Sequence, residues 1–287
     1  MTTTRRSTVA AGFRTTILLA FLTGLLVVIG FAIGGPSTAL AFLVIGALFN
    51  LGAFWFSDRI ALKMAGAKPV AENDAPGLYR IVRELTTRAD LPMPSIYVIP
   101  QDQPNAFATG RSPKRSAVAV TSGIMKLLSE DELRGVLSHE LAHIRHRDIL
   151  VQSVAATVGG AITWIAYMML WFGGDDESPL SLVASLAMVL LAPIAASLIQ
   201  LAISRQREYA ADAPGAEICG NPESLASALL RLEEGAKAIP MQVNQAAEPL
   251  YIVKPFQARG VAGLFSTHPP IEERVRRLRA MAAAPVA

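Results

Sequence analysis

The sequence predicts a mainly α-helical integral membrane protein, with four transmembrane helices and a cytoplasmic part that contains a small β-sheet. Hydrophobic residues make up 52% of the 287 residues and charged residues only 17%, so the chain is more apolar than an ordinary soluble domain. The apolar residues form four uncharged runs of at least 19 residues, close to the length that spans a bilayer as a helix. The predicted spans are about 15–33, 38–56, 149–172 and 180–203.

The basic residues give these spans an orientation. All 26 Lys and Arg lie outside the four runs and outside the links 34–37 and 173–179. Because cytoplasmic segments carry the excess of Lys and Arg, the N-terminus, the middle segment and the C-terminal tail are predicted to be cytoplasmic. The net charge of +3 gives no reason to expect a nucleic acid partner, and the basic residues are expected beside the lipid bilayer.

The chain divides at the ends of the apolar runs. An N-terminal membrane hairpin (1–57) is followed by a cytoplasmic segment (58–148), a second membrane hairpin (149–203) and a cytoplasmic tail (204–287). A signal peptide ending at Ala39-Leu40-Ala41 is the alternative for the first run, but a second apolar run continues through that site. Cys219 is the one cysteine, so no disulfide within the chain is expected.

The first cytoplasmic segment carries signals for helices and strands in alternation. A helical pattern over 77–89 is followed by β-rich runs over 95–99, 105–109 and 116–121, which predict a small sheet. Ser129 and Glu132 have the spacing of a capping box and predict the start of the next helix.

The tail is expected to contain at least two further helices. Asn221 and Pro222 suit the first positions of a helix that continues to about Lys237. A basic amphipathic helix is expected from Pro269 to about Met281. Its arginines are predicted to lie on a solvated or lipid-facing surface: Arg274, Arg276, Arg277 and Arg279.

The helix that begins after Ser129 carries the sequence His139-Glu140-Leu141-Ala142-His143, an HExxH pattern. Two His at i and i+4 lie on one face of a helix, so both imidazoles can reach one zinc ion. Glu140 is then placed to accept a proton from water at the metal. An apolar stripe on the opposite side predicts that the helix is buried there: Leu133, Leu137, Leu141 and Ile144.

A third metal ligand is needed, and three residues compete for the role. His146 lies about 10 Å beyond His139 along a straight helix, too far to share a tetrahedral ion. His268 is suitable by residue type alone. Glu208 follows the fourth run by five residues, while His143 precedes the third run by six, so the second hairpin would bring the two side by side. Geometry therefore favours Glu208, with an ion pair to Arg205 or Arg207 as the alternative role.

Asp212 lies one helical turn beyond Glu208 and on the same face. It is placed to accept the second N–H of a ligand imidazole, which would set the tautomer of that histidine. A helix-terminal acid before Pro214 and Gly215 is the simpler alternative, because Pro214 is expected to end the helix early.

Several blocks together resemble one family, the HtpX-type membrane zinc metalloproteases, which are related to the Ste24 CaaX-prenyl proteases. The resemblance extends over nearly the whole chain and includes the four apolar runs. The matching blocks are Asn105–Arg111 (NAFATGR), Ala117–Gly123 (AVAVTSG), Leu128–Leu150 around HELAHIRHRD, Ser204–Asp212 (SRQREYAAD) and Leu264–Leu278 (LFSTHPPIEERVRRL).

The resemblance implies a cytoplasmic, gluzincin-like zinc peptidase domain with one Zn²⁺ per chain. By motif, His139, His143 and Glu208 are the implied zinc ligands and Glu140 the general base. Asp212 is the implied partner of a ligand histidine. Asn105 and His268 are implied near the substrate, where His268 could donate to the developing oxyanion.

The expected reaction is hydrolysis of peptide bonds in misfolded or damaged membrane proteins, at the cytoplasmic face of a bacterial inner membrane. An extended substrate could pair with an edge strand, and the strand expected in that role comprises Ala117, Val118, Ala119, Val120 and Thr121. Two alternatives are a prenyl-peptide protease of the Ste24 kind and a catalytically silent zinc-binding scaffold. The intact Glu140 between the two histidines argues against the scaffold, since structural zinc needs no base.

Overall fold

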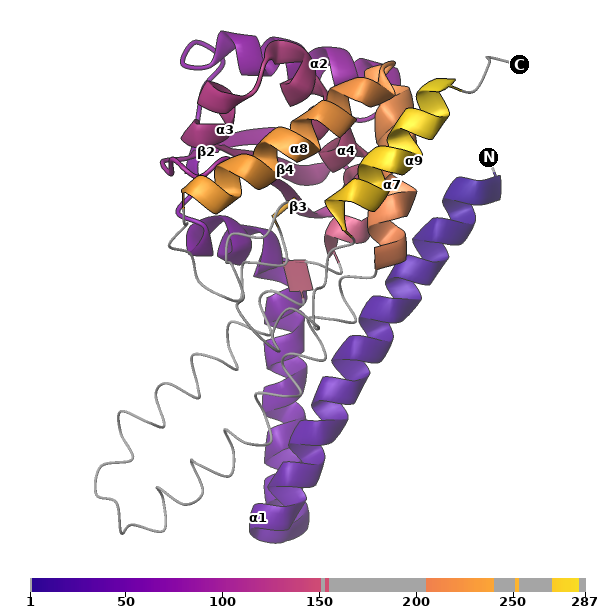
Figure 1. The fold of residues 1–287 in the computed structure, drawn as a ribbon. Helices are drawn as coiled ribbons and strands as arrows, with labels where there is room; N and C mark the ends of the chain where they lie inside the picture. Colours follow the sequence, from indigo (N-terminus) through magenta and orange to yellow (C-terminus); the bar gives the residue numbers. More distant parts are fainter. Residues whose placement is uncertain (1, 151–152, 155–204, 240–250, 253–269, 284–287) are drawn as a thin grey trace.

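The structure is a computed structural model that describes residues 2–150, 153–154, 205–239, 251–252 and 270–283. The first element, α1 (Thr2–Met64), is assigned as one helix of 63 residues with Pro36 inside it. Figure 1 shows that its ribbon runs away from the N-terminus, reverses direction and returns to the rest of the protein. Gly35 has a φ of 70°, which glycine adopts without strain, and it lies in the link where a turn was expected.

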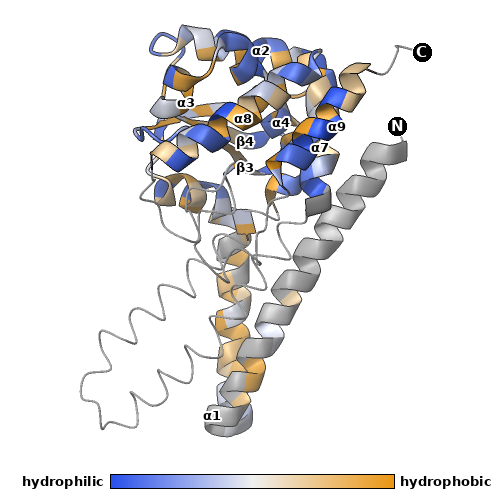
Figure 2. Cartoon of the chain, in the orientation of Figure 1, coloured by the Kyte–Doolittle hydropathy of each residue, from blue (hydrophilic) through white to orange (hydrophobic). Residues whose placement is uncertain are grey.

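The returning arm of α1 is strongly apolar (Figure 2) and exposes large side chains, among them Leu48 and Leu51 at 65% and 63%. Among the described residues, no single helix is both long and apolar enough for a membrane span. One bent pair, Gly35–Phe49 and Phe54–Met64, meets both requirements together at an angle of 64°. The expected spans 149–172 and 180–203 lie almost entirely outside the described residues.

A four-stranded mixed sheet follows α1, with the strand order β1-β2-β4-β3. The strands expected at 95–99, 105–109 and 116–121 are confirmed, and a short strand at 68–69 was not expected. β2 pairs in parallel with β4, whereas β3 is antiparallel to β4 and joined to it by a tight turn. The strands are β1 (Lys68–Pro69), β2 (Ser95–Ile99), β3 (Ala106–Ser112) and β4 (Arg115–Thr121).

The expectation that 117–121 forms an edge strand is wrong. Each of these five residues has a partner in β2 on one side. The residues Ala117, Val118, Ala119 and Val120 also have partners in β3 on the other side, and Thr121 N donates to Asn105 O at 2.9 Å. The chain reaches this position because β3 turns back and inserts β4 between itself and β2. The outer strand on that side of the sheet is therefore β3.

Helices cover the sheet, and the central helix, α4 (Glu130–His146), is surrounded by the others. Figure 1 shows α8 crossing in front of the sheet, α9 beside α7, and α2 at the end of the domain farthest from the α1 reversal. The capping box is present, since Ser129 Oγ accepts from Glu132 N and Glu132 Oε2 accepts from Ser129 N. The other helices are α2 (Pro76–Ala89), α3 (Ser122–Leu127), α7 (Arg205–Cys219), α8 (Pro222–Ala238) and α9 (Ile271–Ala283).

Burial of α4 goes further than its apolar stripe predicted. Leu133, Leu137, Leu141 and Ile144 are buried, but so are His139, Glu140 and His143 on the other side. α4 packs against α2, α7, α8 and β3, so its polar face is enclosed by protein. Buried polar groups are stable only with partners, so this face must be the centre of a polar network.

The expectation that Pro214 ends its helix early is also wrong. α7 continues through Pro214 to Cys219. A proline inside a helix removes one backbone hydrogen bond, and tertiary packing must compensate for that loss. The next residue, Gly215, lies directly against the backbone of His139, and this contact holds α7 to the centre of α4.

Candidate active site

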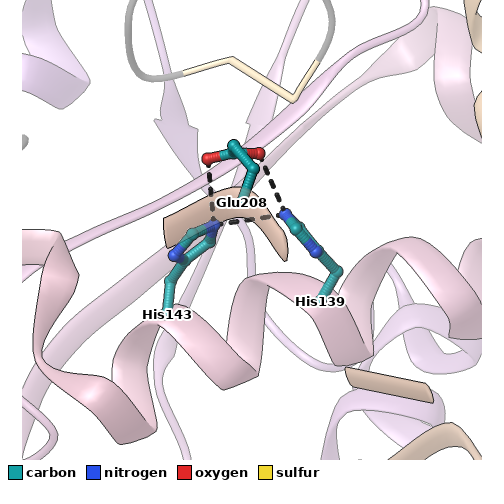
Figure 3. Close-up of side chains that lie close together, drawn as sticks. All are labelled: His139, His143 and Glu208. Carbon is teal, nitrogen blue, oxygen red and sulfur yellow. Dashed lines mark hydrogen bonds and ion pairs between the residues drawn. The ribbon is translucent and has the colours of Figure 1, made fainter. Parts of the chain in front are cut away.

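Two histidines of α4 face each other across one helical turn, as their spacing predicted. The Nε2 atoms of His139 and His143 are 3.1 Å apart, and both side chains are nearly fully buried. Their rings are nearly perpendicular, which directs both Nε2 atoms toward one point above the helix. Figure 3 shows this point occupied on its far side by a carboxylate from another helix.

That carboxylate is Glu208, in the first turn of α7. Its Oε2 lies 3.6 Å from His139 Nε2 and its Oε1 lies 3.6 Å from His143 Nε2 (Figure 3). His143 and Glu208 are therefore side by side, as predicted, while the hairpin expected between them lies almost entirely outside the described residues. His146 is half-buried and does not belong to this group.

The three ligand atoms fit a tetrahedral metal ion. Ligand atoms of a tetrahedral zinc site with bonds near 2.0–2.1 Å are roughly 3.3 Å apart. The distances of 3.1 Å between the imidazole nitrogens and 3.6 Å from each nitrogen to the carboxylate are near this value. The donor set of two imidazoles and one carboxylate leaves a fourth position open, which is typical of catalytic zinc sites.

Glu140 lies between the two histidines in sequence and faces β3. Its Oε2 accepts a hydrogen bond of 2.7 Å from the backbone N–H of Ala108, so the carboxylate has a fixed position. Burial raises the pKa of Glu140, while the neighbouring His139 and His143 oppose that rise. A buried carboxylate with a raised pKa beside a metal site is suited to accept and return a proton.

Asp212 holds the outer nitrogen of His139. The Oδ1 atom of Asp212 is 3.0 Å from His139 Nδ1, which leaves Nε2 free to bind a metal. Burial by itself would raise the pKa of Asp212, but the charge of Arg274 and the hydrogen bond from His139 lower it to about 2. Asp212 is therefore a charged acceptor that sets the ring orientation and tautomer of this ligand.

Arg274 corrects the prediction that the arginines of the last helix lie on the surface. Its side chain is 1% exposed, and it donates two hydrogen bonds to Asp212, at 2.9 Å from Nε and 2.6 Å from the second terminal nitrogen. Its other terminal nitrogen is 3.6 Å from Glu208 Oε2. Burial opposes its charge, but Asp212 and Glu208 raise its pKa further. Arg274 thus bridges Glu208 and Asp212, the acid that contacts His139.

The charge of the cluster also fits a divalent cation. Glu140, Glu208 and Asp212 are buried carboxylates around the two imidazoles, and Arg274 is the cation that contacts two of them. With all three carboxyl groups ionised, these four groups carry two negative charges in excess. A buried excess of this size is costly, and a bound divalent ion would neutralise it.

The two remaining candidates, Asn105 and His268, differ in what the structure describes. Asn105 is fully buried immediately before β3, and its Oδ1 accepts from Ala106 N at 3.1 Å. His268 lies outside the described residues. The outer edge of β3 is partly in use, because Ala106 O accepts from Ile252 N at 3.1 Å and Ala108 N donates to Glu140.

The approach of α7 to α4 depends on Gly215, which leads to a first prediction. A Cβ atom at this position would lie 2.9 Å from the Cα atom of His139, so Gly215→Ala must push α7 away from α4. We expect about 1–3 kcal/mol of destabilisation from the overpacking. Because Glu208 and Asp212 are on α7, the affinity for zinc should fall roughly tenfold or more. Thermal unfolding and competition with a chromophoric chelator measure both effects.

Gly77→Ala is the matched control for this prediction. A Cβ atom at Gly77 meets nothing within 4 Å, and Gly77 is in the first turn of α2. The control should bind zinc like the native chain and be equally or slightly more stable. Unchanged zinc affinity in Gly215→Ala would contradict the role given to this contact.

The fold and the site define a metallopeptidase of the HExxH class, with Glu208 of a separate helix beside the two histidines. The model of peptidase family M48 matches residues 72–282, and the chain belongs to this family. The family and its relatives together make the chain a membrane-associated metalloprotease, which sets aside the expectation of a silent scaffold.

Curated relatives confirm the resemblance that the motifs indicated. The chain is 54% identical to a protease HtpX homolog of Pelotomaculum thermopropionicum, over 93% of this chain and 97% of the relative. It is 51% identical to a protease HtpX homolog of Syntrophobacter fumaroxidans, over 94% and 99%. The crystal structure of S. mikatae Ste24p is similar in fold, with a TM-score of 0.50 and 18% identity over 95% of this chain and 66% of that one.

Proposed function

We propose that the chain is a zinc-dependent endopeptidase in which His139, His143 and Glu208 hold the metal and Glu140 is the general base. The observation that carries this proposal is the convergence of the three ligand atoms, all within 4.8 Å of one another, beside the buried Glu140. When bound, zinc supplies Lewis acidity that polarises the scissile carbonyl and makes water more acidic. Zinc is the metal that this combination of donors and an open position favours.

The proton transfers fall to Glu140. Its carboxylate is held by Ala108 N–H at Oε2, which leaves the other oxygen to accept a proton from the attacking water. The raised pKa of Glu140 lets the same carboxyl group pass the proton on to the leaving amine. Asp212 and Arg274 keep His139 in the ligand tautomer during these steps.

The outer edge of β3 is the surface against which we expect the substrate backbone to lie. Ala108, which contacts Glu140, belongs to this strand, so an extended peptide beside β3 would pass the base. Pairing through the main chain selects little for side chains, which suits a protease that removes misfolded or damaged membrane proteins. His268 and Asn105 are proposed near the reacting carbonyl, with His268 as a donor to the oxyanion.

Cleavage of an unstable membrane protein tests the proposed substrate class. A destabilised multi-span protein is reconstituted in vesicles with the native chain or with Glu208→Gln, treated with a chelator, and supplied with zinc. We expect zinc-dependent cuts by the native chain in segments on the side of its own C-terminus, and none by Glu208→Gln. The proposal would be contradicted if cuts persist in Glu208→Gln, or if the stable form of the same substrate is cut as fast as the destabilised form.

We propose four transmembrane helices at 15–33, 38–56, 149–172 and 180–203, with both soluble segments in the cytoplasm of a bacterium. The support is the apolar, exposed returning arm of α1 and the distribution of Lys and Arg. The single Cys219, partly exposed at the end of α7, makes the orientation measurable. A membrane-impermeant maleimide should label Cys219 only after spheroplasts are permeabilised.

A relocated cysteine is the control for this labelling. In Ser37→Cys combined with Cys219→Ser, the cysteine is in the link between the first two runs and should be labelled in intact spheroplasts. Labelling of Cys219 from the outside would reverse the proposed orientation.

A further inference from the structure

A pocket lies away from the candidate metal site, where the end of α1 meets the start of β2 and the turn between β3 and β4. Its volume is about 560 Å³. Four basic side chains line it, one from α1 and three from the β3–β4 hairpin: Arg59, Arg111, Lys114 and Arg115. Asp58 is the one acidic residue of the lining. The proposed peptidase mechanism uses none of these residues, and of the four basic ones only Arg111 lies in a block that resembles the family.

The basic residues of this pocket differ from the surface arginines of α2. Arg80 and Arg83 on α2 are each in an ion pair with a glutamate, at 2.7 Å. Within the described residues, by contrast, none of the four basic side chains of the pocket is within ion-pair distance of a carboxylate. The lining thus carries three positive charges in excess, four basic side chains against Asp58, and such a site attracts an anion.

One wall of the pocket is aromatic and belongs to α1. Trp55 and Phe56 form this wall, and they are the last residues of the apolar run 38–56. Both are exposed, at 52% and 46%. The guanidinium of Arg111 lies 4.3 Å from the centre of the Trp55 ring and donates to Trp55 O at 3.2 Å. Trp side chains at the end of a membrane span lie at the level of the lipid headgroups.

We propose that this pocket binds the headgroup of an anionic glycerophospholipid. Arg and Lys side chains recognise phosphate oxygens by charge-assisted hydrogen bonds, and four of them, from α1 and the β3–β4 hairpin, line one cavity. The aromatic wall at the end of an apolar run places that cavity beside acyl chains, which favours a lipid over a soluble phosphate. The inference rests on the membrane placement of α1 proposed above. A bound lipid would join α1 to the β3–β4 turn, and so tie the membrane segment to the sheet.

Fluorescence of Trp55 tests the proposal in the full-length protein. The sequence has three Trp, and Trp164→Phe with Trp171→Phe leaves Trp55 as the sole emitter. This protein is reconstituted in vesicles that contain phosphatidylglycerol or phosphatidylcholine brominated near the headgroup, and quenching is measured against the mole fraction of brominated lipid. We expect a preference for phosphatidylglycerol of about a hundredfold, taking roughly fivefold for each of the three positive charges that the four basic side chains carry in excess over Asp58.

Two double substitutions, each removing two positive charges, show whether the preference for phosphatidylglycerol comes from this pocket. Lys114→Gln with Arg115→Gln, both exposed at the β3–β4 turn, should lower the preference roughly 25-fold. Arg80→Gln with Arg83→Gln removes the same charge at the far end of the domain (Figure 1) and should leave the preference unchanged. Equal melting temperatures of the two variants show that neither effect comes from unfolding.

The remaining outcomes separate this proposal from the membrane placement. Equal quenching by both lipids would overturn the lipid site while the membrane placement stands. Lack of quenching by either lipid would remove the membrane placement of Trp55, and this proposal with it. Inorganic phosphate at millimolar concentration should not displace the lipid; if it abolishes the preference, the pocket is a soluble-phosphate site and the proposed source is wrong.

Discussion

Glu140→Gln is expected to lower kcat for peptide cleavage by roughly 10²–10⁴-fold, the usual contribution of a general base. The amide cannot accept a proton from water or pass one to the leaving amine. Its carbonyl oxygen can still accept the hydrogen bond from Ala108 N–H, so the fold and the ligand positions should not change. Glu140 is not among the three converging ligand residues, and bound zinc should therefore stay the same.

The control for this substitution is on the same helix. Glu132 belongs to the capping box of α4, and glutamine is accepted at that position, so Glu132→Gln should keep native activity. Cleavage of casein and zinc content are measured on all three proteins. Native cleavage rates in Glu140→Gln, with zinc content also native, would refute the role of Glu140.

Arg274→Met is expected to have the largest effect on stability. Methionine fills similar space, but it leaves Asp212 buried without its two hydrogen bonds and Glu208 without its ion pair. Breaking a buried charge pair by removing one partner costs about 3–5 kcal/mol. The loss should be greater in chelator-treated protein than in the zinc-loaded form, because zinc itself neutralises part of the remaining negative charge.

Arg276→Met is the matched control, two residues further along α9. Arg276 is exposed and its ion pair with Glu273 is on the surface, so its removal should leave the melting temperature unchanged. The measurement is thermal unfolding of both variants with and without zinc. Equal effects of the two substitutions would show that the buried pair contributes nothing particular to the site.

Much of this fold could be predicted because its signals are local. The three longer strands, the capping box at Ser129 and the helix that begins after Asn221 each rest on a few neighbouring residues, and the structure contains all of them. The histidine pair is equally local, since its geometry follows from the helical repeat. Glu208 needed one long-range assumption, a helical hairpin between it and His143.

The failures share one cause, which is that spacing along the chain does not give neighbours in space. β4 lies between β2 and β3 because it pairs with both, and the residues of β4 alone do not show which strands will pair with it. Arg274 was treated as a surface residue by its type. Its spacing from Ile271 and Leu278 placed it on the apolar face of α9, and this was the signal that could have identified it as buried.

Pro214 is a further case in which contacts in space decided the structure, because α7 continues through it. A strong local signal for a helix end is overridden by packing, because α7 is held against α4 on either side of the proline. Glu208 and Asp212 precede Pro214, and Gly215 follows it against the backbone of His139.

The central claim is that one zinc ion, held by His139, His143 and Glu208, makes this chain a peptidase. Its most direct test is the initial rate of peptide cleavage by metal-free protein as zinc is added, with bound zinc measured in the same samples. The account predicts that the rate rises in proportion to bound zinc, reaches its limit at one ion per chain, and stays at background in Glu208→Gln. Full cleavage by the metal-free protein, or equal cleavage by Glu208→Gln, would contradict it.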